Sequence, residues 1–160
     1  NREPRNLPLN DDTDYGLCFA CGPRHPSGLR LRFERKGNLV TTTFKSSTQH
    51  QGFPGYLHGG ITSTLLDEVM SRVSLSDGRW SMTARMDVRF RRPIFADQTV
   101  TAIAEKAGQS RRFVEAKGRV VLPDGTVAAE ATGTYALMDA ETLRGMSEGY
   151  PQLAREWMAV

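Results

Sequence analysis

The chain is 160 residues long, which is enough for one domain with a hydrophobic core of its own. Its net charge of +3 suits a phosphate-bearing partner, but so small an excess is more typical of an ordinary solvated surface. No basic surface with interleaved aromatic residues indicates nucleic acid, and no apolar run is long enough to cross a membrane. Because the N-terminus is polar and unlike a signal sequence, we expect a cytoplasmic protein without a membrane or nucleic-acid partner.

The two cysteines, Cys18 and Cys21, stand three residues apart near the start of the chain. A single pair does not make a disulfide framework and is typical of reduced thiols in the cytosol. A zinc site would need two more ligands, which His25 and either His50 or His58 could supply. Because a second cysteine pair is missing, we expect a structural loop and no metal.

The first third of the chain predicts an arm, a loop and two strands. Residues 1–15 are polar and predict an arm with little structure of its own, followed by the cysteine loop as far as Gly28. Alternating apolar and polar residues then predict half-buried strands over Leu29–Glu34 and Val40–Lys45. The short turn at Gly37-Asn38 makes these two strands antiparallel.

A single long helix is predicted after the sequence His-Gly-Gly, ending near Ser76. Its apolar residues recur at spacings of three or four: Ile61, Leu65, Leu66, Val69 and Val73. Two adjacent glycines let the first turn approach another group closely, and free amides there can hold a partial negative charge. Asp67 follows Gly60 by about two helical turns, on the same side as those amides. A carboxylate on so apolar a helix needs a function or a partner.

Four strand candidates follow the helix: Met82–Arg92, Thr99–Ala107, Phe113–Leu122 and Thr126–Met138. The first shows the clearest period of two, with Met82, Ala84, Met86, Val88 and Phe90 alternating with Thr83, Arg85, Asp87, Arg89 and Arg91. From Asp139 onward, helical spacing predicts one or two short helices. One helix between two strands and four consecutive antiparallel strands predicts an α+β fold, a curved sheet wrapped around a mostly buried helix.

This pattern resembles the hotdog-fold acyl-CoA thioesterases, in particular the branch named after the phenylacetate-pathway thioesterase. The matching segments are His58-Gly59-Gly60, Leu65-Leu66-Asp67, His50 to Gly55 and Phe90 to Ile94, and the likeness extends from Cys18 to Met138.

The resemblance implies a hotdog fold of about six antiparallel strands around one helix. The domain would span residues 29–138, with residues 1–28 as an N-terminal arm and cysteine loop and residues 139–160 as a C-terminal helical extension. It also implies a homodimer in which Met82–Arg92 pairs with its own copy, often as a dimer of dimers, with the active sites between subunits. The implied substrate is an acyl-CoA, with coenzyme A as part of that substrate and no separate cofactor.

Carried over to this chain, the resemblance assigns an oxyanion-binding amide to Gly59 or Gly60 and the role of nucleophile or general base to Asp67. Gln51 would orient the water or the carbonyl, and Thr83 would position the water. For His58 we favour a hydrogen bond within the turn over a role in proton transfer.

The resemblance also implies that arginines hold the phosphates of coenzyme A, because the guanidinium group binds phosphate in a bidentate manner. They come from the strand that ends at Pro93 and from the turn near Gly108, and we expect contacts from Arg91, Arg92, Ser110 and Arg111.

Three alternatives stay open on the sequence alone. The chain could be a hotdog dehydratase or hydratase, which needs a His paired with an acid, or a non-catalytic protein that senses acyl-CoA. Asp67 could instead be a buried structural acid, and we expect its neighbour Glu68 to pair with an arginine at the surface or the dimer contact. The identity of the acyl group is not predicted.

Overall fold

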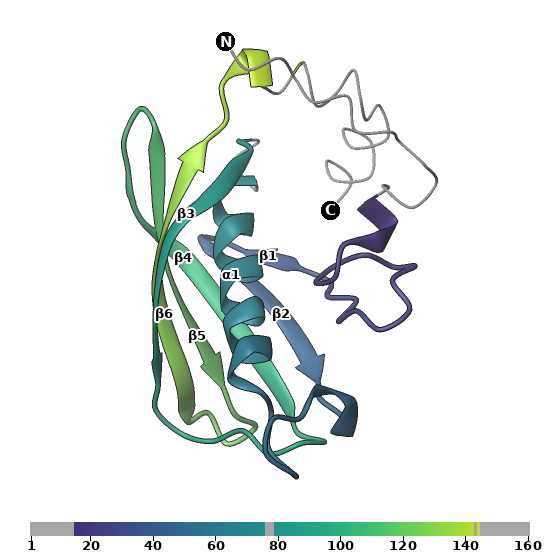
Figure 1. The fold of residues 1–160 in the computed structure, drawn as a ribbon. Helices are drawn as coiled ribbons and strands as arrows, with labels where there is room; N and C mark the ends of the chain where they lie inside the picture. Colours follow the sequence, from purple (N-terminus) through teal and green to yellow (C-terminus); the bar gives the residue numbers. More distant parts are fainter. Residues whose placement is uncertain (1–14, 76–78, 143, 145–160) are drawn as a thin grey trace. The chain divides into compact units, whose positions relative to one another are not determined.

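In the part of the chain that the structure describes, six strands form one antiparallel sheet in the order β1-β2-β4-β5-β6-β3, and a single long helix lies against one face of it (Figure 1). The computed structural model describes residues 15–75, 79–142 and 144. The bounds of its elements are η2 Tyr15–Leu17, β1 Glu34–Lys36, β2 Leu39–Lys45, η3 Thr48–His50, α1 Gly59–Leu75, β3 Ser81–Phe90, β4 Thr99–Gln109, β5 Phe113–Val121 and β6 Val127–Leu137. The predicted hotdog arrangement of a sheet around one helix is confirmed.

The core lies between α1 and the sheet. The apolar side of α1 is fully buried at Leu65, Leu66, Val69 and Met70. The strands opposite it present mostly small side chains, namely Ala102, Ala104, Ala116, Ala129 and Ala131. At Gly118 a Cβ atom would come within 3.0 Å of Met70 Cγ, so the helix approaches β5 as closely as a glycine allows.

Strand β3 forms one edge of the sheet and pairs with β6 alone among the described strands. Its predicted alternation is broken, because the register shifts between Thr83 and Arg85 and leaves Ala84 as an extra residue. As a result Thr83 shares a face with Met86, whereas strict alternation would put them on opposite faces. This bulge turns the Thr83 side chain toward α1, where it bonds to the helix.

The predicted strand over Leu29–Glu34 is largely wrong, since β1 is confined to Glu34–Lys36. Leu31 is buried while Arg32 is exposed, so the burial still alternates. Arg30, however, has a φ of +51°, which an extended strand cannot accommodate. The long helix and the other five predicted strands occur with boundaries shifted by up to about two residues, as expected for element ends.

The chain divides into two compact units, residues 1–30 with 138–160, and Leu31–Leu137. In the first unit, residues 140–142 are helical, and Asp139 Oδ1 accepts a hydrogen bond from the Thr142 amide at 2.7 Å. The predicted arm and most of the predicted C-terminal helices lie outside the described residues. Within the described part of the chain, no helix is long and apolar enough to span a membrane.

Candidate active site

The first turn of α1 is capped by the histidine that precedes it. His58 Nδ1 accepts a hydrogen bond from the Gly60 amide at 2.8 Å, and the His58 carbonyl accepts bonds from Ile61 and Thr62. An Nδ1 atom that accepts a bond carries no hydrogen, so His58 acts here as a capping group. Among the described residues, the amide of Gly59 has no acceptor, and it is the free donor at this end of the helix.

Two hydroxyl groups bond to the carboxylate of Asp67 in the middle of α1. Thr83 Oγ1 lies 2.8 Å from Asp67 Oδ1, and the Tyr135 hydroxyl lies 3.1 Å from the same oxygen. The Tyr135 hydroxyl is also 3.2 Å from the backbone carbonyl of Asp67. Within the described residues Oδ2 has no protein partner, so one oxygen is held and the other is free to react.

The sheet brings both hydroxyls to this carboxylate. Thr83 and Tyr135 are directly paired across β3 and β6, so their side chains leave the same face of the sheet. Tyr135 is fully buried. Its burial raises the pKa of the phenol well above the ordinary value, and the negative charge of Asp67 and the hydrogen bond to Asp67 raise it further. The phenol therefore stays protonated and donates to the carboxylate.

The sequence analysis predicted Asp67 and Thr83 as site residues, and the structure joins them by a hydrogen bond, whereas Tyr135 was not predicted. The available signal was that Tyr135 follows a run of small inward-facing residues on β6, namely Ala129, Ala131 and Gly133. A large polar-tipped side chain facing a helix that carries a carboxylate could have indicated a hydrogen bond.

The free amide and the carboxylate are far apart within one chain. Gly59 and Asp67 are separated by eight residues of α1. At about 1.5 Å per residue this corresponds to roughly 12 Å along the helix. Gly59 lies near Phe90 at the end of β3, whereas Asp67 bonds to Thr83 near its start. One chain therefore does not bring the two groups to the same reacting atom.

A small pocket of about 240 Å³ lies beside the free amide. That volume is below the roughly 300–1,000 Å³ of typical ligand sites. Its lining is Leu57, Gly59, Thr62, Phe90, Arg91, Arg92, Pro93, Ile94, Ala128 and Ala129.

In the loop before α1, the Gln51 side chain bonds to the backbone of the same loop. Gln51 Oε1 accepts from the Gly55 amide at 3.1 Å, and the side chain is exposed. Its carbonyl oxygen is therefore engaged in closing the loop, while the amide nitrogen remains available as a donor.

The predicted phosphate contacts fall at two ends of the sheet. Arg91 pairs with Glu130, and the hydrogen bond and positive charge of Arg91 lower the pKa of that carboxyl group. Arg92 is exposed nearby. Ser110 Oγ accepts from the Arg112 and Phe113 amides, and Arg111 is exposed in the same turn.

The register shows how far apart these two groups lie. Phe113 pairs with Ala136 on β6, whereas Phe90 pairs with Ala129. Seven residues of a strand span about 23 Å. The turn with Ser110 and Arg111 is therefore at the opposite end of the sheet from Arg92 and Gly59.

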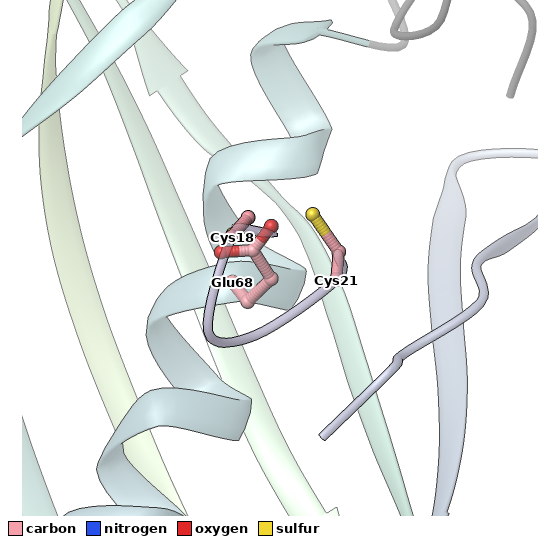
Figure 2. A group of neighbouring side chains, drawn as sticks. All are labelled: Cys18, Cys21 and Glu68. Carbon is pink, nitrogen blue, oxygen red and sulfur yellow. The ribbon is translucent and has the colours of Figure 1, made fainter. Parts of the chain in front are cut away.

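Glu68 pairs with an arginine, as predicted, but that arginine is buried on the same helix and does not lie at the predicted surface or dimer contact. The Glu68 Oε1 atom is 3.1 Å from Arg72 Nη2, one turn further along α1, and the Arg72 side chain is only 7% exposed. Figure 2 shows the Glu68 side chain leaving α1. The guanidinium group of Arg72 also stacks over the Phe33 ring at 4.4 Å. Glu68 therefore has a structural role as the partner of a buried arginine.

In the N-terminal unit, Cys18 and Cys21 lie on the loop after η2 (Figure 2), with their sulfur atoms within 4.8 Å of each other and no disulfide between them. The loop is closed by backbone bonds, including Gly22 to the Cys18 carbonyl at 2.8 Å. His25 Nδ1 accepts from the Ser27 amide at 3.2 Å. Within the described residues, His25 is not grouped with the two thiols as a metal ligand would be.

The sheet order, the single long helix and the capped glycines at its start define a hotdog-fold protein. Residues 54–129 match the family model described as the thioesterase superfamily. The resemblance to the hotdog-fold thioesterases is therefore confirmed.

Two curated relatives carry the name acyl-coenzyme A thioesterase THEM4. The mouse protein is 27% identical over 104 residues, which cover 64% of this chain and 44% of the relative. The bovine protein is 29% identical over 100 residues, which cover 61% of this chain and 40% of the relative. The chain thus matches less than half the length of either relative.

Solved structures share the fold. A hypothetical thioesterase from Streptococcus pneumoniae, solved with coenzyme A, aligns with a TM-score of 0.64 at 22% identity, over 68% of this chain and 85% of that one. The Escherichia coli PaaI protein, from the phenylacetic acid degradation operon, aligns with a TM-score of 0.65 at 20% identity, over 69% and 81%. Similarity at this level establishes the fold alone.

Proposed function

We propose that this chain forms an acyl-CoA thioesterase, which hydrolyses a thioester to a free acid and coenzyme A. The proposal rests on two groups of helix α1. Among the described residues, the Gly59 amide has no acceptor, and the Asp67 carboxylate has hydrogen bonds to Oδ1 but none to Oδ2. Support comes from the thioesterase family match and from the relatives named acyl-coenzyme A thioesterase. Within these enzymes we propose the phenylacetate-pathway branch, and the PaaI protein shares the fold.

In this reaction the Gly59 amide holds the thioester carbonyl oxygen as it gains negative charge. Asp67 acts through Oδ2, either taking a proton from water or attacking the carbonyl carbon. In either route the carbon–sulfur bond breaks, the acyl carbon gains the hydroxyl of water, and the sulfur leaves as the thiol of coenzyme A. The proposed reaction uses Gly59, Asp67 and water, and coenzyme A enters it as part of the substrate.

We propose that each site is assembled from two copies of the chain. Gly59 and Asp67 are about 12 Å apart within one helix, too far for one acyl group. If β3 pairs antiparallel with its own copy near its middle, the Thr83 end of one chain lies beside the Phe90 end of the other. This places Asp67 of the second copy near Gly59 of the first. A dimer of dimers is the further assembly we propose.

The same pairing assigns the phosphate contacts. Arg91 is already paired with Glu130, so we propose that Arg92 contacts the phosphates at the Gly59 end. Arg111 and Ser110 lie at the opposite end of each sheet and would join that site from the second copy. Gln51 would contribute its amide nitrogen, and Thr83 acts by holding Asp67.

Variants of a solved relative point to the same pair of residues. Structures of the S. pneumoniae protein include one with an aspartate changed to alanine and one with a threonine changed to alanine, sixteen residues apart. Asp67 and Thr83 are separated by the same interval here. We propose that Asp67 performs the chemistry in this chain while Thr83 holds its carboxylate, in a cytoplasmic enzyme whose cysteines remain thiols.

Release of coenzyme A from a panel of aryl- and fatty-acyl-CoAs tests the proposal. Asp67→Asn is expected to lower the rate by about 10²–10⁴-fold with the fold intact. A variant as fast as wild type would show that Asp67 takes no part. A wild-type protein that binds acyl-CoA but never hydrolyses it would favour a sensor.

A matched pair of variants tests the amide. Proline is tolerated at the first position of a helix and has no N–H, so Gly59→Pro removes the donor. Gly59→Ala keeps the donor, and its Cβ would meet the Phe90 ring at an ordinary 3.5 Å. We expect the proline variant to lose about 10²–10³-fold in kcat and the alanine variant to lose far less.

A further inference from the structure

The Tyr135 hydroxyl joins strand β6 to helix α1 at Asp67. It is 3.1 Å from Asp67 Oδ1 and 3.2 Å from the Asp67 carbonyl. The tyrosine is fully buried, while the carboxylate is half-buried. A buried donor next to a carboxylate forms a charge-assisted bond, which is stronger than a neutral one.

The two donors to Asp67 bind the same oxygen. Thr83 Oγ1 approaches Oδ1 at 2.8 Å, so Oδ1 accepts from both hydroxyls and Oδ2 accepts from neither. A carboxylate held at one oxygen cannot rotate freely about its Cβ–Cγ bond. The free oxygen then points in one direction.

We propose that Tyr135 is a positioning residue that fixes the orientation of the Asp67 carboxylate, so that Oδ2 faces the thioester. This inference rests on the proposed hydrolytic function. In this role Tyr135 acts through its hydrogen bond to Asp67.

Gly133 makes room for this arrangement. A Cβ atom at Gly133 would lie 2.7 Å from Tyr135 Cε2 and 3.0 Å from the hydroxyl oxygen. Since the ring is fully buried, it could not move aside into solvent. The glycine two residues before Tyr135 therefore lets the phenol lie along β6 and reach the helix.

A purely structural role predicts a different result. The same hydroxyl could simply anchor α1 to the sheet, as Ser74 does when its Oγ meets Ser81 Oγ at 2.6 Å. Ser74 is buried on the same helix, and within the described part of the chain its hydroxyl bonds to the Ser71 carbonyl and to Ser81, neither of which is a proposed catalytic residue. Ser74→Ala is thus a matched control for the loss of one buried hydroxyl.

The experiment compares kcat, KM and thermal stability for Tyr135→Phe, Gly133→Ala, Ser74→Ala and Asp67→Asn on the acyl-CoA that wild type hydrolyses fastest. Tyr135→Phe is expected to lower kcat about 10- to 100-fold with KM within about twofold. Gly133→Ala keeps the hydroxyl but displaces it, and should lower kcat likewise. Ser74→Ala should change stability while leaving kcat near wild type.

The outcomes separate the two proposals. If Tyr135→Phe keeps wild-type kcat while Asp67→Asn is inactive, the positioning role is wrong and the hydrolytic function stands. If Tyr135→Phe unfolds, or loses no more rate than Ser74→Ala, the hydroxyl is only an anchor and the proposal is overturned. If Asp67→Asn is as fast as wild type, the proposed function itself fails.

Discussion

The raised pKa of Tyr135 links the stability of the protein to alkaline pH. Burial is the main cause, and the charge of Asp67 and the hydrogen bond to Asp67 add to it. In the unfolded chain the phenol ionises near pH 10. Below that pH the phenol is protonated in both the folded and the unfolded state, so Tyr135 makes its full contribution to the free energy of unfolding. Above it the unfolded state loses the proton first, and stability falls by about 1.4 kcal/mol per pH unit.

We therefore predict that wild type loses its advantage over Tyr135→Phe as the pH rises above about 10, since phenylalanine does not ionise. Urea unfolding of both proteins between about pH 8 and pH 11 measures this difference. The gap should be constant below pH 10 and shrink above it. Two curves that stay parallel over the whole range would contradict the prediction.

His58 provides a second test at the residue scale. Because its Nδ1 accepts from the Gly60 amide, His58→Ala should lower the free energy of unfolding by about 0.5–2 kcal/mol, the usual cost of a lost cap. His58→Asn offers a side-chain oxygen to the same amide and should restore most of that loss. Chemical denaturation measures both. An asparagine variant that is stable but inactive would instead give the imidazole a part in proton transfer.

At the scale of elements, the fit of α1 on the sheet determines stability. Leu66 is fully buried, and its Cδ2 atom would lie 3.4 Å from a Cβ atom at Gly118. We predict that Leu66→Ala costs about 2–5 kcal/mol, because the cavity between helix and strand cannot collapse. Urea denaturation measures the loss of stability. Leu39→Ala removes the same side-chain atoms at a half-buried position on β2 and serves as the control. Equal costs at both positions would argue against a close-packed helix face.

The elements themselves were largely predictable, since hydrophobic periodicity depends on residues close in sequence. The exception near Arg30 comes from a positive φ, which arginine does not signal. The sequence pattern also gave no sign of the bulge at Ala84, which determines the face of the sheet on which Thr83 lies. In the site, Asp67 was predicted from a helical spacing, whereas Tyr135 depends on pairing between strands far apart in sequence. A single sequence does not show such pairing.

At the scale of the whole molecule, a site shared between two copies predicts complementation. Asp67→Asn and Gly59→Pro each abolish one half of every site, so either protein alone should be inactive. In a mixed dimer one site combines the intact Gly59 of one chain with the intact Asp67 of the other. After full subunit exchange, the mixture should recover about a quarter of wild-type activity.

Coenzyme A release by the mixture, measured against each variant alone, tests this prediction. A mixture of Gly59→Ala with Asp67→Asn serves as a control for mixing itself. If the two inactive proteins stay inactive after exchange, each chain carries a complete site and the shared arrangement is wrong.

The edge strand β3 has a further consequence. Its ladder is open on one side, and it presents Met82 and Phe90 with 63% and 57% of their surface exposed. If that edge is where two half-sites meet, the rate per chain depends on the total concentration of the protein. Dilution below the dissociation constant of the pair would then switch hydrolysis off without any inhibitor, and abundance itself would regulate turnover.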